Sequence, residues 1–333
     1  MERARFNPRH PFFAHADSEL FLARDSGRVV GRIAAIDDRL HNDTHHDNLA
    51  AFGHFEAATE EAARALFVTA EGWARGRGRG RMRGPLNSSL NETAGLLVDA
   101  FDMDPMVMMP YNLPHYAGFI ERAGYGKVKD LLAWLLDLPG ELHTERWTRI
   151  AARARSRNGL TIRSVDMSAF AAEIERYVDV YCRAWRGNWG FVEPTRAEVQ
   201  QLASELRYIV DRDLVLGAEV DGRIVGCGVA LPDLNQTFKG TNGRLFPLGL
   251  LRLLARKRIV TQVRVLLFGV IPEWRRIGLP VALFAELLTR AARRYVRAEL
   301  SWVLEDNDLT NLGIAAMGGR RYKTYRLYQK ELA

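Results

Sequence analysis

The chain has 333 residues, of which 47% are hydrophobic and 26% are charged, with a formal net charge of +7. These values are typical of a folded globular protein, and the length suits two domains of about 150 residues each. The N-terminal sequence has no apolar segment, and no apolar run reaches the ~18 residues of a membrane-spanning helix. We therefore expect a cytoplasmic protein without a signal peptide or membrane span. Cys182 and Cys227 are isolated, which argues against a disulfide framework or a cysteine metal site.

Two pairs of similar segments indicate an internal duplication. Asp25–Gly31 resembles Val220–Gly226, and each predicts a β-hairpin with turn residues at its tip. Ala123–Trp134 resembles Met317–Tyr328 at an offset of 194 residues, against 195 for the first pair. Two weak matches at nearly the same offset favour a duplication more than either match alone.

The duplication predicts the domain organisation of the chain. We place a first domain at residues 1–140, a linker at 141–164 and a second domain at 165–333. The linker begins where charged helical sequence follows the strand that ends at Leu138.

Two polar segments of the first half have alternative interpretations. His41, Asp43, His45, His46 and Asp47 have metal-ligating side chains, but a single cluster without a rigid element more often forms a polar loop. Residues 75–84, RGRGRGRMRG, resemble an RNA-binding Arg/Gly tract, but aromatic residues do not alternate with the arginines. We therefore expect no metal and regard nucleic acid as an unlikely partner.

Two apolar segments are candidates for the walls of a pocket. Met103, Met106, Met108 and Met109 suit either a flexible acyl chain or an irregular core. The aromatic segment 185–191, WRGNWGF, suits either an acceptor wall or a loop anchored to the core.

Residues 234–264 form a basic insertion that the first half lacks. No acidic residue lies between Asp233 and Glu273. The seven basic residues in this interval are Lys239, Arg244, Arg252, Arg256, Lys257, Arg258 and Arg264. A short amphipathic helix is predicted to start near Pro247. Such a helix suits an anionic membrane surface or an acidic acyl carrier protein, or it covers the sheet with a solvated basic edge.

The segment 265–283 predicts a phosphate-binding turn between a strand and a helix. The apolar strand Val265–Val270 is followed by a proline, the turn Arg275–Gly278 and an amphipathic helix over 281–296. Free N–H groups and the helix dipole attract phosphate at a helix N-terminus, and Arg275 adds a charged fork. Glycine at position 278 allows the backbone to approach closely.

The sequence after this helix predicts the strand Glu299–Glu305, a short helix over Asn311–Met317 and the strand Tyr322–Gln329. Together with the Arg-x-x-Gly turn, this order resembles the GNAT (GCN5-related) N-acyltransferase superfamily. Over most of its length the chain also resembles a two-domain bacterial subgroup that includes ceramide-synthase-like acyltransferases. The resemblance implies an α/β (α+β) protein with a tandem GNAT-like acyl-CoA N-acyltransferase fold, in which helices flank a mixed central sheet in each half.

The resemblance also implies where the acyl donor binds. The strand would hold the donor's pantetheine arm through its backbone, and the turn would hold its pyrophosphate. The donor-binding residues are then Phe268, Gly269, Val270, Arg275, Arg276, Ile277, Gly278, Leu279 and Asn307. Pro280 lacks the N–H of the residue usual there. In the first half the strand Phe52–Glu56 enters its helix without such a turn, so we expect a degenerate domain that shapes the acceptor pocket.

Transfer to an amine also requires a general base. Glu299 and Glu305 share one face of the predicted strand, and Asp306 follows it; these three are the candidates. Relatives place a tyrosine acid where this chain has Ile314, so Tyr322 or Tyr325 are substitutes.

We therefore expect an N-acyltransferase. The donor is acetyl-CoA with a small amine, or a longer acyl-CoA or acyl carrier protein thioester with a sphingoid-type amine at the inner membrane surface. A sensor that binds acyl-CoA without transfer is the alternative, motivated by Pro280 and Ile314. Superfamily members commonly pair, so a homodimer is possible.

Overall fold

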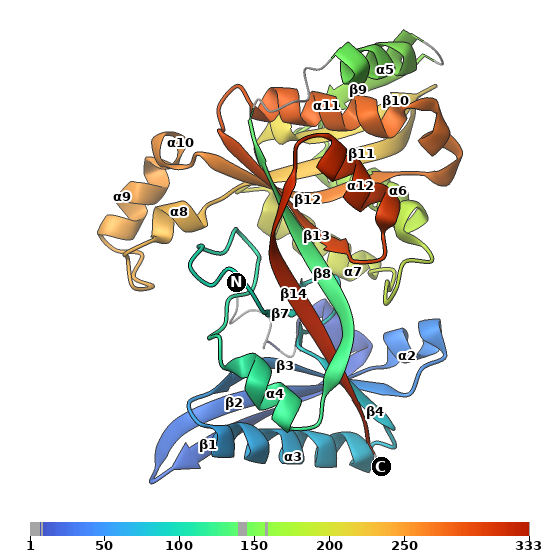
Figure 1. The fold of residues 1–333 in the computed structure, drawn as a ribbon. Helices are drawn as coiled ribbons and strands as arrows, with labels where there is room; N and C mark the ends of the chain where they lie inside the picture. The colour runs from blue at the N-terminus through green and yellow to red at the C-terminus, as the bar shows by residue number, and fades with distance from the viewer. Residues whose placement is uncertain (1–6, 8, 139–144, 157–158, 333) are drawn as a thin grey trace.

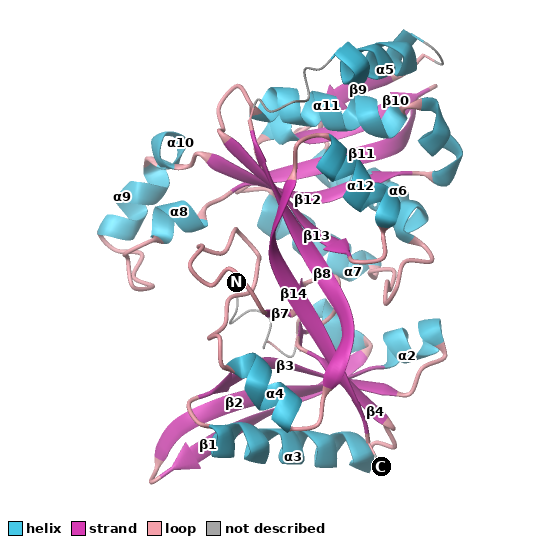
Figure 2. Ribbon diagram, in the orientation of Figure 1, coloured by secondary structure: helices cyan, strands magenta, loops and turns pink. Residues whose placement is uncertain are grey.

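The computed structural model describes residues 7, 9–138, 145–156 and 159–332. Among these residues, 12 strands form one mixed sheet that runs through the whole molecule (Figure 1). Its order is β1-β2-β3-β4-β14-β8-β13-β12-β11-β10-β9, and β7 pairs with β14 outside this path. β5 and β6 form a separate small sheet. Figure 2 shows most of the helices lying against the two ends of the large sheet, whereas α8, α9 and α10 project to one side.

The first half supplies the following elements: η1 (Pro11–Ala14), β1 (Ala16–Asp25), β2 (Arg28–Asp38), α2 (Arg39–His45), β3 (Leu49–Ala57), α3 (Glu60–Gly76), β4 (Arg81–Gly84), β5 (Leu86–Asn87), β6 (Thr93–Ala94), β7 (Leu96–Leu97), α4 (Tyr116–Arg122) and β8 (Gly126–Asp137). β1 and β2 form the predicted hairpin, in which Ser26 and Gly27 adopt positive φ of 47° and 80°. Helix α3 starts directly after β3, capped by Thr59, so the first half has no Arg/Gly turn.

The second half supplies the following elements: α5 (Glu145–Ser156), β9 (Thr161–Ser164), α6 (Phe170–Trp185), α7 (Arg196–Leu206), η3 (Arg212–Leu214), β10 (Val215–Val220), β11 (Arg223–Pro232), α8 (Asn235–Phe238), α9 (Leu248–Leu254), α10 (Arg256–Ile259), β12 (Gln262–Val270), η4 (Pro272–Ile277), α11 (Leu279–Ala291), β13 (Arg297–Leu304), α12 (Asp308–Ala316) and β14 (Arg320–Glu331). β10 and β11 form the second predicted hairpin. The segment 141–164 contains α5 and β9 in its described part.

The last strands of the two halves are exchanged. β14 lies between β4 and β8, and β8 lies between β14 and β13, so each half receives the final strand of the other. The two long strands run side by side through the middle of the molecule (Figure 2). Arg326 of β14 donates two hydrogen bonds to Asp130 of β8, at 2.8 and 3.1 Å. The halves are thereby joined by a continuous backbone ladder.

Strands β12 and β13 separate halfway along their length. They pair in parallel from Gln262↔Arg297 to Val265↔Leu300, and β12 then continues to Val270 without a partner on that edge among the described strands. The register between β11 and β12 shifts at Val229/Ala230, where β12 contains one extra residue, Leu266. A β-bulge of this kind bends a strand and re-aims its backbone groups, and it lies here at the start of the separation.

Three clusters of buried apolar side chains make up the core. One fills the second half around α11 and β10–β13, and one fills the first half around α3. The third lies between the halves and includes Leu131, Leu304, Tyr325, Met106 and Met109. The methionine segment therefore packs into the junction of the halves.

Candidate active site

The free edge of β12 presents backbone groups that the sheet does not use. Residues 266–269 lie beyond the last rung with β13, so their N–H and C=O groups on that edge are available to an extended ligand. On one side Phe268 packs edge-on against Phe284 of α11, with ring centroids 5.4 Å apart. On the other side a Cβ on Gly269 would lie 3.0 Å from Ala184. The strand is thus fixed between α11 and α6.

The turn after β12 is held by Arg275. Its Nε donates to the carbonyl of Val270 at 2.9 Å, and its Nη2 donates to the carbonyl of Ala184 at 2.6 Å. The Arg275 guanidinium therefore fixes the turn, which differs from the phosphate fork expected from the sequence. Arg276 and Ile277 are exposed beside it.

Gly278 begins helix α11 in the left-handed conformation, with φ 82°, and no side chain caps the helix within the described structure. Leu279 is buried, and Pro280 lies in the first turn. A Cβ on Gly278 would lie 3.0 Å from the Ile150 side chain, because α5 packs against this end of α11. The uncapped N-terminus and Arg276 together form a site with positive potential.

A buried polar cluster lies at the point where β12 and β13 separate. Glu299 of β13 is fully buried, and Arg264 opposite it on β12 is 4% exposed. Ser301 connects them: it accepts a 2.8 Å hydrogen bond from Arg264 Nε and donates to Glu299. Tyr322 of β14 donates its hydroxyl to the other oxygen of Glu299. Burial raises the pKa of Glu299, although Arg264 and Ser301 oppose the shift.

The methionine segment covers this cluster and is tied to it by polar groups. The buried Lys323 donates to the carbonyls of Met103 and Asp104, at 2.9 and 2.8 Å. Arg264 Nη1 donates to the carbonyl of Val107 at 3.0 Å. Burial also lowers the pKa of Lys323.

Tyr325 lies in the same region. It is fully buried, and its hydroxyl has no hydrogen-bond partner among the described residues.

The other carboxylates lie apart from Glu299. The register of β13 against β8 shifts between Leu300 and Val303, which interrupts the alternation expected along this strand. Glu305 contacts Lys127 at 2.7 Å and accepts the N–H of Asp130. Asp306 is 58% exposed and bonds Lys129 at 2.7 Å. Asn307 caps α12 through the N–H of Thr310.

Aromatic residues of the second half lie beside the free edge of β12. The rings of Trp185 and Trp302 lie 6.4 Å apart, and Trp185 is next to Gly269 of the free β12 edge. Asn91 of the first half accepts a hydrogen bond from Tyr181 and donates to the carbonyl of Val192. The aromatic segment 185–191 is therefore held against the first half.

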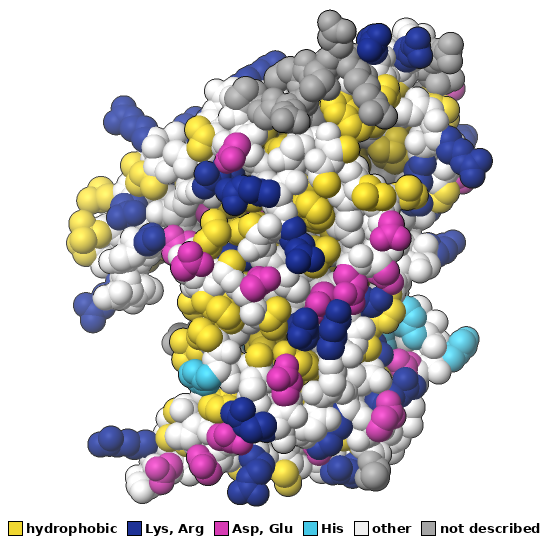
Figure 3. Space-filling model, viewed as in Figure 1, with side chains coloured by type: hydrophobic (Ala, Val, Ile, Leu, Met, Phe, Trp, Pro, Cys, Tyr) yellow, Lys and Arg dark blue, Asp and Glu magenta, His cyan; other side chains and the backbone are white. Residues whose placement is uncertain are grey.

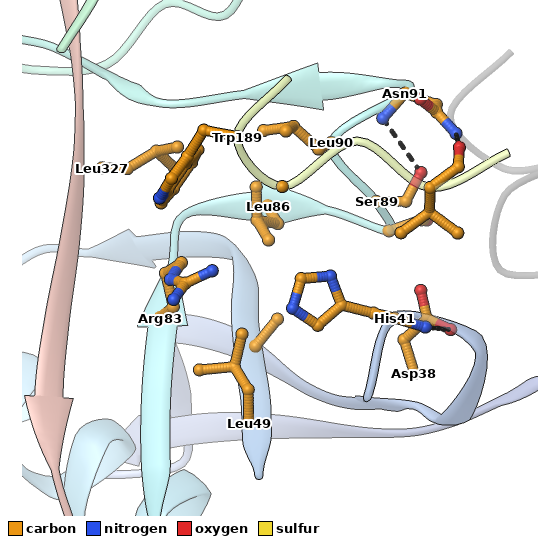
Figure 4. A pocket seen from close by; sticks show the side chains of 14 residues that line it. Asp38, His41, Leu49, Arg83, Leu86, Ser89, Leu90, Asn91, Trp189 and Leu327 are labelled. Atoms are coloured by element: carbon orange, nitrogen blue, oxygen red, sulfur yellow. Dashed lines mark hydrogen bonds between the residues drawn. The ribbon is translucent and has the colours of Figure 1, made fainter. Parts of the chain in front are cut away.

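A pocket lies between the halves at this contact (Figure 4). His41 and Arg83 lie on one side of it, and Trp189, Leu90 and Asn91 lie on the other. Burial lowers the pKa of His41 to about 4, aided by His45 and Arg83, so its imidazole is neutral at pH 7. The Arg83 guanidinium lies 4.8 Å from the centroid of the Trp189 ring and donates two hydrogen bonds to the side-chain oxygen of Gln329. Leu327 of the pocket belongs to the same apolar cluster as Tyr325.

The structure also bears on the polar segments of the first half. No group of side chains suited to a metal ion occurs in the described part of the chain. Most arginines of the tract 75–84 pair with side chains elsewhere in the protein: Arg79 with Asp37, Arg81 with Asp47 and Arg83 with Gln329. None of the described helices is both long enough and apolar enough to cross a bilayer.

Sequence reasoning missed several residues of the site. Arg264 interrupts the apolar run of β12, and a single charge in a buried strand was a usable signal. The contributions of Lys323, His41, Arg83 and Asn91 depend on contacts between the halves, for which the local sequence gives no signal.

Comparisons with known proteins agree with this arrangement, although no protein-family model matches the chain. "Bacterial ceramide synthase" of Caulobacter vibrioides is 39% identical over 335 residues, which cover 97% of this chain and 86% of that protein. "Protein YghO" of Escherichia coli is 34% identical over 332 residues, which cover 97% of this chain and 85% of that protein. The solved structure of a tandem GNAT protein from the clavulanic acid biosynthesis pathway shares the fold, with a TM-score of 0.55 at 14% identity, over 96% of this chain and 84% of that one. The predicted tandem GNAT fold is thereby confirmed.

Proposed function

The chain belongs to the GNAT acyltransferase family that includes bacterial ceramide synthase, and from this premise we propose that it transfers an acyl group from a long-chain acyl-CoA to the amine of a sphingoid-type lipid. The observation that carries the proposal is the pair formed by the buried Glu299 and the partly buried Tyr322, at the point where β12 and β13 separate. Amine, thioester and base must meet within hydrogen-bonding distance, and this point offers a carboxylate beside free backbone groups.

The donor would lie along the free edge of β12. Phe268, Gly269 and Val270 would pair with the amide groups of the pantetheine arm, as one strand pairs with another. The N–H groups at the start of α11, together with Arg276, would hold the pyrophosphate. Arg275 would act through its bonds to Val270 and Ala184, which keep the turn in place.

The reaction requires the loss of a proton from the substrate ammonium. Tyr322 would face the amine, and Glu299 behind it would receive the proton through the tyrosine hydroxyl. A carboxylate whose pKa is raised is a better base near neutral pH than an ordinary one. The amine nitrogen would then attack the thioester carbonyl and the C–S bond would break. The CoA thiolate would leave and take up the second proton that the nitrogen loses as the amide forms. Backbone N–H groups of β12 would stabilise the intermediate oxyanion.

The acceptor would approach from the junction of the halves. Trp185, Trp302 and the methionine segment give this side an apolar surface, and the pocket at His41 and Trp189 extends it. Apolar walls with few polar groups suit a lipid amine better than a small polar one.

The test is an assay of the purified protein with palmitoyl-CoA or acetyl-CoA, and with sphinganine or a short-chain primary amine. We expect an amide product and free CoA with palmitoyl-CoA and sphinganine. Product with acetyl-CoA and the short amine alone would contradict the lipid assignment. Tight acyl-CoA binding without product from any amine would indicate a sensor.

A further inference from the structure

The basic insertion projects from the body of the molecule. Helices α8, α9 and α10 form a lobe beside β12 and β13, at the left of Figure 1. Large apolar side chains at its tip face outward: Phe246 is 70% exposed, Leu248 68%, Leu251 61% and Leu254 70%. A helix that covered a sheet would bury these side chains. The lobe therefore has an apolar surface without a partner among the described residues.

Basic residues surround this apolar tip. Lys239 and Arg244 precede it, and Arg256, Lys257 and Arg258 follow it, all exposed. Figure 3 shows hydrophobic side chains gathered on the lobe with lysines and arginines around them. Acidic residues are absent from the sequence of the insertion, 234–264. The surface thus combines exposed leucines with a cluster of positively charged side chains.

We propose that this lobe docks on an anionic lipid bilayer, with Phe246, Leu248, Leu251 and Leu254 inserted among the lipids. The basic side chains would contact the anionic head groups while the apolar side chains leave water, and both contributions favour the same orientation of the lobe. A second copy of the chain is a poorer partner, because two such lobes would bring like charges together. An acidic carrier protein would complement the charge of the basic side chains, but its charge would not by itself bury the leucines.

The lobe is connected to the proposed acceptor side. Lys239 bonds Asp104 at 2.5 Å, Asn235 donates to the carbonyl of Pro105 at 2.9 Å, and Asp233 accepts the N–H of Val107 at 2.9 Å. These contacts hold the lobe against the methionine segment that covers Glu299. Docking would therefore place the bilayer beside the apolar route to the site. That use of the bilayer rests on the proposed function, whereas the docking itself does not.

The experiment is co-flotation of the full chain with vesicles of phosphatidylglycerol and phosphatidylcholine, or of phosphatidylcholine alone. The test variant is Phe246→Ser/Leu248→Ser/Leu251→Ser. The matched control is Leu20→Ser/Leu22→Ser/Val29→Ser, because these three apolar residues are 51%, 55% and 54% exposed on the distant β1–β2 hairpin. We expect wild type and control to float with the anionic vesicles. The lobe variant should lose about tenfold or more in partitioning, and raising the salt to about 0.5 M should weaken wild-type binding.

Three outcomes would overturn the inference: wild type that remains in solution, a lobe variant that floats like the control, or a lobe that binds only an acidic carrier protein or another copy. Transfer in detergent micelles separates this inference from the proposed function. The lobe variant should retain that activity, since its substitutions lie outside the site. A lobe variant that no longer binds vesicles but still transfers the acyl group would show that the lobe serves docking alone. A wild-type protein that binds vesicles but transfers no acyl group would reject the proposed function and leave the docking inference standing.

Discussion

Glu299 lies behind Tyr322 and away from water, whereas Glu305 contacts Lys127 at the surface. Both carboxylates belong to the same short stretch of chain, so their different surroundings give a direct comparison. Glu299 combines a pKa raised by burial with a hydrogen bond from a tyrosine that is itself only partly buried.

Glu299→Gln is expected to lower kcat by about 10²–10⁴-fold with little change in KM, because the amide cannot accept the proton. Glu305→Gln is the matched control and should leave kcat nearly unchanged. Because burial raises the pKa of Glu299, the wild-type rate should fall as the pH drops through that raised value, and the variant should lack this limb. Equal losses in the two variants, measured by steady-state kinetics, would remove Glu299 from the mechanism.

Arg276 tests the donor site better than Gly278 does. A side chain at Gly278 would be strained at φ 82° and would meet Ile150, so its effects would mix folding with binding. Arg276→Glu is expected to raise KM for acyl-CoA by about tenfold or more, through repulsion of the pyrophosphate, with kcat little changed. Arg293, beyond the other end of α11, is also exposed, and Arg293→Glu should leave this KM nearly unchanged; similar KM values for both variants would count against the assignment.

At the scale of elements, local sequence patterns predicted most strands and helices well. The strand expected at Val265–Val270 lies inside β12, and the helix expected near Pro247 begins at Leu248. The helix over 281–296 was placed less well, since α11 runs from Leu279 to Ala291. Periodicity is a local property, so it identifies elements but not their ends.

The parts of the site that depend on distant contacts could not be predicted. The Arg275 guanidinium donates hydrogen bonds to carbonyls of β12 and α6, and the alternation of β13 breaks where its register shifts. Neither fact follows from residue spacing, because both depend on the elements that pack alongside.

Lys323 gives a prediction about the methionine segment. Lys323→Met would leave the carbonyls of Met103 and Asp104 without their donor, which should lower the free energy of unfolding by about 1–3 kcal/mol. Hydrogen exchange should accelerate at residues 103–109 more than elsewhere. Lys330→Met, on the same strand but bonded to Glu71 and Ala123, is the control, and faster exchange of 103–109 in that variant would show a general rather than local effect.

At the scale of the whole molecule, His15 helps to join the halves. Its ring lies 2.9 Å from Asp38, to which it is hydrogen-bonded, and 3.4 Å from Glu198 of α7, and these two carboxylates raise its pKa from 6.5 to about 9. A folded pKa above the unfolded one means that the stabilisation is complete below about pH 6.5 and is lost as the pH rises through about 9.

His15→Gln should therefore reduce the free energy of unfolding at pH 6, and the difference from wild type should shrink toward about pH 10. Denaturant titrations at several pH values measure this difference. The exposed His115→Gln serves as control, and a His15 difference that stays constant with pH would show that its charge is not involved.

The exchange of β8 and β14 has a consequence for biosynthesis. β14 follows every other described strand along the chain and is therefore synthesised after them, yet it is the strand that pairs with β4 of the first half. The first half must therefore wait, with the edges of β4 and β8 open, until β14 has been synthesised. Open edges of this kind invite pairing with other chains, so nascent polypeptides of this protein should depend on chaperones that shield them.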